Sequence, residues 1–276
     1  MPIVWLVLSA AVLHAIWNTL LKSSSDKLLS LAFIAGSGAA VCWVFVPLVP
    51  PPDPGCYPWL ALSVLFHVGY YTALVRGYEH GDLSLVYPIA RGTGPLWVAL
   101  VSVPVAHETL TRREGLGVAT LCTGIALLAW RRTAGRATRT PLLYAFATGL
   151  FIGCYTLSDG MGVRASGHPI SYILWMNALE GIPLLGIALI LRRGRLRAFL
   201  RADRGRSVWG GLIAALAYGI VIWAYAHGTI APIAALRETS VVLAAWLGSR
   251  LLHEPFGRSR LAAAGIVALG VLLLAA

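Results

Sequence analysis

Charged residues are scarce in this sequence. Lys, Arg, Asp and Glu together make up 12% of its 276 residues, whereas hydrophobic residues make up 58%. A water-soluble domain carries roughly twice that share of charged residues. Because nearly continuous apolar runs fill the chain and only short polar segments separate them, the composition excludes a soluble domain and predicts a polytopic membrane protein.

Motifs of catalysis and cofactor binding are missing as well. The sequence has no Walker loop, dinucleotide-binding fingerprint, nucleophile elbow or paired-histidine zinc motif. Its four cysteines show no Cys-x-x-Cys spacing, which argues against a metal site. The net charge of +11 does not indicate a nucleic-acid partner, because the basic residues form short clusters between apolar runs. We therefore expect no enzyme activity, no metal and no cofactor.

Ten apolar segments follow one another along the chain. A helix that crosses the hydrocarbon core takes roughly 20 residues, and backbone groups cannot stay unpaired in lipid. The segments lack the alternation of a β-barrel. The predicted fold class is therefore an all-α membrane protein with ten transmembrane helices. The segments span residues 3–21, 28–49, 57–76, 83–105, 114–130, 141–162, 169–191, 207–226, 229–252 and 260–275.

The basic residues lie mainly in alternate loops between these segments. Of the 22 Lys and Arg residues, seventeen fall in the odd-numbered loops and three in the even-numbered loops, while Arg91 and Arg237 lie inside segments. Because basic loops stay in the cytoplasm, the sequence predicts that both termini lie on the other side of the membrane. We expect a multi-pass protein of the bacterial inner membrane.

The two halves of the chain resemble each other. A shift of 147 residues aligns Tyr71 with Tyr218, and a shift of 146 aligns Arg91 with Arg237. Because each half holds five segments, the halves have opposite orientations, as in many secondary transporters. The predicted organisation is two inverted five-helix repeats, residues 1–132 and 139–276. Further pairs in register are Tyr78 with Tyr225, His80 with His227, Gly81 with Gly228, His107 and Glu108 with His253 and Glu254, Arg112 with Arg258, and Gly124 with Gly270.

Several stretches of the sequence are similar to the ten-helix EamA-type branch of the drug/metabolite transporter superfamily. They are HAIWN from His14, GDLSLVYPIARGTGP from Gly81, VAHETLTRREGLG from Val105 and RLLHEPFGRSRLAAAG from Arg250. The resemblance covers essentially the whole chain and implies a basket of two five-helix halves around a central cavity. HAIWN, VYPIARG and ALRETSV also resemble a subgroup associated with phosphonate utilisation.

Ionisable side chains inside a membrane are costly and therefore mark candidate sites. Arg91 and Arg237 each lie about eight residues into an apolar segment. A guanidinium stays charged and presents a planar fork that suits carboxylate or phosphonate oxygens. We predict that this pair faces a cavity and binds an anionic group. The alternative is internal neutralisation, for instance of Arg237 by Glu238 or Glu180.

Proline and glycine residues surround Arg91, and Tyr87 shares its helix face at four-residue spacing. The prolines and glycines are expected to break the hydrogen-bond ladder of this helix. Such a break is tolerated at this depth only next to protein or a wet cavity. A kink that serves packing alone is the alternative. The residues concerned are Pro88, Gly92, Gly94 and Pro95.

Asp159, Glu180 and Glu238 are acidic residues within the apolar segments. A carboxylate at that depth is either paired or protonated. A protonatable carboxylate suits coupling to protons or other ions, and a permanent ion pair with an arginine is the alternative. Neighbouring side chains on a helix point in different directions, so Arg237 and Glu238 are predicted to serve different partners.

Histidine, amide and aromatic side chains complete the candidate site. His14 and Asn18 share a face of the first segment, and His67 and Tyr71 form a band on the third. Such groups line solute cavities, although hydrogen bonding between helices explains them equally well. The predicted solute-binding residues are His14, Asn18, His67, Tyr71, Tyr87, Arg91, Asp159, Glu180, Arg237 and Glu238.

The sequence thus predicts a secondary transporter that carries a small polar metabolite by alternating access. The arginines favour an anionic or zwitterionic solute, such as an amino acid or an organophosphonate. Alternatives from other classes are an intramembrane lipid-modifying enzyme, a flippase of a lipid carrier, a scaffold or small channel, and an exporter of cationic or neutral drugs. Proton or ion coupling and a monomeric or homodimeric state are all compatible with the sequence.

Overall fold

The computed structural model describes residues 2–80, 83–133, 139–251 and 258–275. Within these ranges the secondary structure is helical throughout. The elements are α1 (Pro2–Lys22), α2 (Lys27–Phe45), η1 (Val46–Leu48), η2 (Pro54–Cys56), α3 (Tyr57–His80), α4 (Leu83–Ala106), α5 (Arg112–Thr133), α6 (Arg139–Ala165), α7 (Pro169–Leu191), η3 (Arg193–Arg195), α8 (Leu196–Ala202), α9 (Arg204–Tyr225), α10 (Ile230–Arg237), α11 (Ser240–Leu251) and α12 (Arg258–Ala275). The predicted repeat residues Gly81, His253 and Glu254 lie outside the described residues, as do residues 134–138 between the two predicted halves.

Seven helical stretches of the described residues are long and apolar enough to cross a membrane. The chain is therefore an all-α membrane protein. α12 adds a shorter apolar stretch, and each of the ten predicted segments coincides with helix in the described residues, the ninth with the pair α10 and α11. The seven stretches are Pro2–Leu21, Lys27–Leu48, Pro54–His80, Val86–Ala106, Arg139–Ala165, Pro169–Leu191 and Arg204–Tyr225.

The outer surface of these helices is apolar. Leu65, Leu100, Leu143 and Ile190 are each more than 60% exposed. In water so many exposed leucine and isoleucine side chains would cause aggregation, whereas lipid tails are as apolar as the side chains themselves. The amphipathic stripe that a soluble helix needs is accordingly missing from most of these helices, and their polar residues turn inward.

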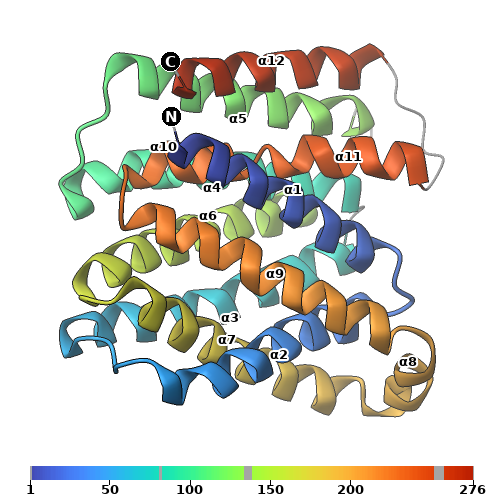
Figure 1. Cartoon of the computed structure of the whole chain (residues 1–276). Helices are drawn as coiled ribbons and strands as arrows, with labels where there is room; N and C mark the ends of the chain where they lie inside the picture. The colour runs from blue at the N-terminus through green and yellow to red at the C-terminus, as the bar shows by residue number, and fades with distance from the viewer. Residues whose placement is uncertain (1, 81–82, 134–138, 252–257, 276) are drawn as a thin grey trace.

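The helices run side by side between two ends of the bundle (Figure 1). The two chain termini lie at one end, the terminus end, whereas α8 and the α1–α2 turn lie at the other. Asp203 joins these two segments, because its Oδ2 accepts hydrogen bonds from the Ser25 hydroxyl at 2.6 Å and the Ser25 amide at 3.0 Å. We call this second end the basic end, since residues 192–206 hold seven arginines.

α5 and α12 pack against each other at one edge of the bundle (Figure 1). A Cβ on Gly270 would lie 2.7 Å from the backbone nitrogen of Leu121, and one on Gly124 would lie 2.9 Å from that of Val267. These repeat-related glycines therefore allow the two helix backbones to touch. Of the residues that the structure describes in these two helices, none lines the central cavity discussed below.

The helix that carries Arg91 is not divided, although Pro88 and Pro95 lack the amide hydrogen that the ladder needs, as expected. The helix is continuous over Leu83–Ala106 and includes Pro88 and Pro95. Glycine serves close packing here, because a Cβ on Gly94 would lie 2.6 Å from Cγ2 of Ile152 in α6. Tight contact with a neighbouring helix thus holds α4 in helical form around its prolines, which is tolerated in membrane helices.

The break lies instead at the repeat-related place in the second half. α10 ends at Arg237 and α11 begins at Ser240. The amides between them bond back over three residues, Glu238 to the Ala235 carbonyl at 3.0 Å and Thr239 to the Leu236 carbonyl at 3.1 Å. Neither glycine nor proline occurs between Arg237 and Ser240, so no local sequence signal marks this turn.

Candidate functional site

A cavity of about 80 Å³ lies at the centre of the bundle. Most of its lining side chains are buried, including those of Arg91 and Arg237, whereas Glu180 is 12% exposed. Six of the ten predicted site residues line it: His14, His67, Tyr71, Arg91, Glu180 and Arg237. The other lining residues are Trp17, Leu31, Ile34, Ala35, Gly38, Tyr70, Tyr155, Asn177, Gly211, Ala214, Ala215 and Tyr218.

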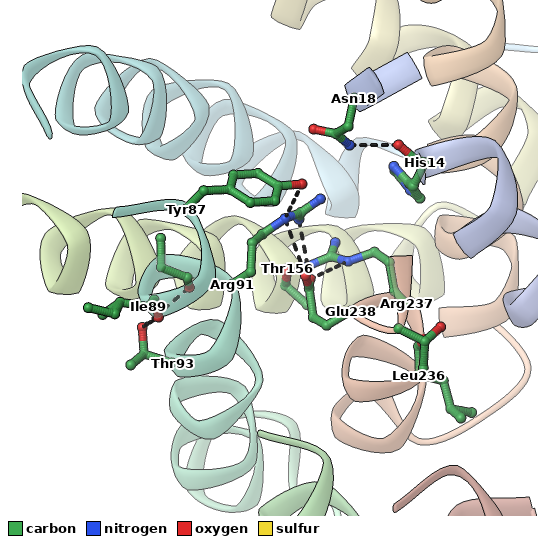
Figure 2. A network of polar contacts seen from close by, with 12 residues as sticks. His14, Asn18, Tyr87, Ile89, Arg91, Thr93, Thr156, Leu236, Arg237 and Glu238 are labelled. Carbon is green, nitrogen blue, oxygen red and sulfur yellow. Dashed lines mark hydrogen bonds and ion pairs between the residues drawn. The ribbon is translucent and has the colours of Figure 1, made fainter. Parts of the chain in front are cut away.

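Arg91 and Arg237 come from opposite halves of the chain and share one carboxylate (Figure 2). Glu238 lies between them, with its Oε2 3.2 Å from Nε of Arg91 and its Oε1 2.8 Å from Arg237 Nη2 and 3.0 Å from Arg237 Nε. All three side chains are at most 5% exposed. Because two guanidinium groups face a single carboxylate, this wall of the cavity keeps one net positive charge.

The prediction that Arg237 and Glu238 serve different partners is wrong. On a regular helix, neighbouring side chains point about 100° apart. Here the helix ends at Arg237, and the tightened turn brings the Glu238 carboxylate back onto its neighbour's guanidinium. Glu238 therefore neutralises the charge of Arg237 only in part, because the same carboxylate also pairs with Arg91.

Tyrosine rings lie beside both guanidinium groups. The guanidinium carbon of Arg237 lies 5.8 Å from the ring centres of both Tyr155 and Tyr218, and that of Arg91 lies 5.5 Å from the ring centre of Tyr87. The Tyr87 hydroxyl also accepts a hydrogen bond from Arg91 Nε at 3.3 Å. Aromatic faces attract cations where water is excluded, so these rings hold the guanidinium groups in place without neutralising them.

Another wall of the cavity, formed by α3 and α7, carries a negative charge. Glu180 of α7 accepts a hydrogen bond from the Tyr71 hydroxyl, and its Oε1 lies 3.7 Å from Nε2 of His67. His67 stacks on Tyr155 with ring centres 4.0 Å apart. Tyr155 in turn faces Arg237, so a continuous run of side chains leads from the acidic wall to the basic one.

His14 offers an unused donor to the cavity. Its Nδ1 accepts a hydrogen bond from the indole of Trp17 at 2.9 Å. In a neutral imidazole the other ring nitrogen then carries the proton. This Nε2 is buried and has no hydrogen-bond partner among the described residues, although buried polar atoms are nearly always paired.

Four predicted site residues lie outside the lining of the cavity. Asn18 is turned back on its own helix, where its amide donates to the His14 carbonyl at 2.7 Å (Figure 2). Tyr87 accepts a hydrogen bond from Arg91, and Glu238 accepts hydrogen bonds from both arginines. Asp159 is fully buried and accepts hydrogen bonds from Tyr218 at 2.5 Å and Tyr172 at 3.1 Å.

The structure adds aromatic residues that the predicted site lacks. Tyr155 of α6 and Tyr218 of α9 both line the cavity and both face Arg237. For Tyr218 a signal was present, because it is the repeat partner of Tyr71. Tyr155 has no such partner and no charged neighbour in sequence. Only the packing of α6 against the other helices brings it to the site.

A buried, charged cavity inside a bundle of membrane-length helices defines the class of this molecule, a polytopic membrane transporter. The model of the EamA-like transporter family matches the chain twice, over residues 1–130 and 139–276. The protein thus belongs to the EamA-like transporter family, within the drug/metabolite transporter superfamily, and the expectation that it is not an enzyme is confirmed.

A solved crystal structure has the same fold, with a TM-score of 0.74 and 16% sequence identity over 100% of this chain and 98% of that one. No curated protein matches the sequence. These findings do not extend to the phosphonate-associated subgroup, and that finer resemblance stays a prediction.

Proposed function

We propose that this protein is a secondary transporter of a small zwitterionic solute of the amino-acid class, which it carries by alternating access. The observation that supports this most is the pair of oppositely charged walls in one small cavity. Arg91 and Arg237 share a single glutamate on one wall, and Glu180 lies on the other. A solute with one carboxylate and one ammonium group complements both walls.

The basic wall suits a carboxylate. Its one uncompensated positive charge belongs to guanidinium groups, whose N–H donors match the two oxygens of a carboxylate. The unpartnered Nε2 of His14 supplies a further donor in the same cavity. A buried donor without a partner costs free energy, and a bound carboxylate would remove that cost.

The acidic wall suits an ammonium group. Glu180 lines the cavity, and its present partners are the Tyr71 hydroxyl and the more distant His67. Neither arginine pairs with it among the contacts of the described residues. The Glu180 charge is therefore left for a cationic group of the solute, and a purely anionic solute would meet repulsion there.

The size of the cavity favours a small solute. A volume of about 80 Å³ has room for roughly five to eight water-sized groups. An α-amino acid with a short side chain has about this many non-hydrogen atoms, and an aminophosphonate of similar length is a second member of the class. A drug-sized molecule needs a pocket of roughly 300–1,000 Å³.

Alternating access is often built on two related halves, and we also propose ten spans arranged as two inverted five-helix repeats. The double match of the family model and the meeting of Arg91 and Arg237 at one carboxylate support this arrangement. The excess of arginine at the basic end supports a cytoplasmic position for that end, with both termini on the outer side of a bacterial inner membrane.

Transport by purified protein in liposomes tests the proposed function. Liposomes loaded with unlabelled alanine should accumulate external labelled alanine by exchange, and unlabelled serine or aminomethylphosphonate should compete. Propionate and ethylamine, which each keep one of the two charges, should compete weakly.

Arg237→Gln, reconstituted in equal amount, should abolish the exchange. Exchange that ethylamine inhibits as well as alanine does would contradict the proposal and favour a cationic solute. Wild-type protein that binds every compound and exchanges none would refute transport itself.

A further inference from the structure

A second cavity, of about 350 Å³, opens between α3 and α7 at the basic end. We call it the α3–α7 vestibule. Arg76, Glu79 and Arg192 line its mouth, where Arg76 and Glu79 form an ion pair of 3.3 Å and are 59% and 43% exposed. Exposed ionic side chains require water, so the mouth lies at the aqueous boundary of the membrane. Deeper inside, the lining is apolar and includes Val75 and Leu184.

Tyr71 separates this vestibule from the central cavity. It lines both spaces, and among the residues that the structure describes around them no other side chain does. The ring is half-buried, and its hydroxyl donates a hydrogen bond to Glu180. The bond joins α3 of the first half to α7 of the second, across the gap through which a solute would enter from the basic end.

At the terminus end, an ion pair and several hydrogen bonds connect helices of the two halves. Arg164 of α6 lies 2.6 Å from the Glu108 carboxylate and donates to the carbonyls of Tyr225 at 2.9 Å and Gly228 at 2.7 Å. Glu108 also accepts the Ile230 amide, at 2.9 Å and 3.0 Å from its two oxygens. These bonds join the α4–α5 segment, α6 and the α9–α10 turn, and so link the two halves at this end.

An apolar groove of about 630 Å³ also adjoins the central cavity, with Asn177 and Ala215 common to both. It lies between α7 and α9, and its lining is otherwise made of residues such as Leu216, Ile220 and Trp223. Such a surface at membrane depth faces lipid tails and offers no partner to a charged solute. The α3–α7 vestibule is therefore the route that suits a zwitterion.

We infer that Tyr71 is a gate that the solute itself opens, by placing its ammonium group on Glu180 in exchange for the tyrosine hydroxyl. The inference rests on the proposed function, because it assigns the ammonium group to Glu180. Before binding, the Tyr71–Glu180 bond keeps the vestibule apart from the cavity. An arriving ammonium group competes for the same carboxylate, and its charge makes it the stronger partner.

A gate and an ordinary ligand contact at Tyr71 predict opposite effects of removing its hydroxyl. If Tyr71 held the solute, removal of its hydroxyl would weaken binding. If Tyr71 competes with the solute, the same change frees Glu180 and strengthens the binding of ammonium-bearing ligands. Carboxylates without an ammonium group do not use Glu180, so their binding stays unchanged. Tyr218 is the matched control, because it is the repeat partner of Tyr71 but donates to Asp159 instead.

The first test measures alanine and propionate binding to wild type, Tyr71→Phe and Tyr218→Phe by calorimetry. The dissociation constant for alanine should fall by about tenfold in Tyr71→Phe, the value of one hydrogen bond to a charged group. Propionate binding should not change, and Tyr218→Phe should show no such gain. Weaker alanine binding in Tyr71→Phe would overturn the gate.

The second test needs no solute and therefore judges the gate even if the zwitterion proposal fails. Cysteine is placed in the central cavity as Ala214→Cys and in the vestibule as Val75→Cys, and its reaction with a small charged thiol reagent is followed in otherwise native protein. Unsubstituted protein gives the background of Cys42, Cys56, Cys122 and Cys154.

Tyr71→Ala should speed the reaction of the cavity cysteine severalfold and leave that of the vestibule cysteine unchanged. Thermal melting checks that each variant is folded. Equal rates for the cavity cysteine with and without the Tyr71 ring would show that no gate lies there. If Tyr71→Ala does not fold, Tyr71→Phe in the calorimetric test still decides the matter.

Discussion

The two repeat-related stretches that carry the arginines bring them to one site with different backbone conformations. α4 reads Arg91-Gly-Thr-Gly and remains a continuous helix, whereas the second half reads Arg237-Glu-Thr-Ser and breaks between α10 and α11. Both arginines nevertheless meet at one carboxylate. The repeat therefore preserves the position of the guanidinium groups but not the path of the chain.

The two stretches differ in charge at one position, and this difference accounts for the net positive charge of the cavity wall. Glu238 occupies the place that Gly92 has in the first half. A Cβ on Gly92 would point at α5, 3.4 Å from Cγ2 of Ile125. One half therefore supplies an acid and the other supplies none, and the cavity wall stays positive.

The largest effect is expected from removing the shared acid. Glu238→Gln leaves two buried guanidinium groups without a counter-charge, which should cost about 3–5 kcal/mol of folding stability. Thermal melting in detergent measures it, with Glu79→Gln as the matched control in an exposed ion pair worth about 0–1 kcal/mol. Equal melting temperatures for Glu238→Gln and wild type would show that Glu238 does not hold the arginines together.

The two arginines differ in their distances to Glu238 and in the number of tyrosine rings that they face. Arg237 contacts Glu238 at 2.8 Å and 3.0 Å and faces two tyrosines, whereas Arg91 contacts it at 3.2 Å and 3.3 Å and faces one. Arg237→Gln should weaken alanine binding about 100-fold and Arg91→Gln about 10-fold. Calorimetry gives both values, and the reverse order would mean that α4 and not α10 presents the main carboxylate site.

The continuity of α4 can be tested through its packing. A Cβ on Gly149 of α6 would lie 2.0 Å from the Thr93 hydroxyl and 3.0 Å from the Ala90 carbonyl. Gly149→Ala should therefore push α4 away and cost about 1–3 kcal/mol of stability. Gly186→Ala is the control, since its Cβ would meet nothing within 4 Å. If the two variants melt alike, close packing against α6 is not what keeps α4 intact.

The smallest effect concerns the repeat-related threonines. The Thr239 hydroxyl donates to the Leu236 carbonyl at 2.8 Å in the turn, and Thr93 donates to the Ile89 carbonyl at 2.8 Å in the helix (Figure 2). Both carbonyls also accept a backbone amide, but the Leu236 carbonyl does so over three residues in a turn between two helices. Thr239→Val should therefore cost about 1 kcal/mol, and Thr93→Val, inside a continuous helix, less. A larger loss for Thr93→Val in thermal melts would contradict this account of the turn.

The sequence was sufficient for the class of fold and for the charged centre of the site, but not for the break. Apolar length predicts membrane helices well, since lipid leaves the backbone no other choice. Arg91, Arg237 and Glu180 stand out because ionisable groups are costly at that depth. The break at Glu238 could not be predicted because neither glycine nor proline marks the turn. Tyr155 escaped because only tertiary packing brings it to Arg237.

The most direct test of the central claim is a binding cycle across the two walls. Calorimetry would compare alanine with propionate in wild type and in Glu180→Gln. The account predicts that wild type binds alanine about 10-fold to 100-fold more tightly than propionate, and that Glu180→Gln removes most of this difference. Propionate binding as tight as alanine binding in the wild type, or an undiminished preference in Glu180→Gln, would contradict it.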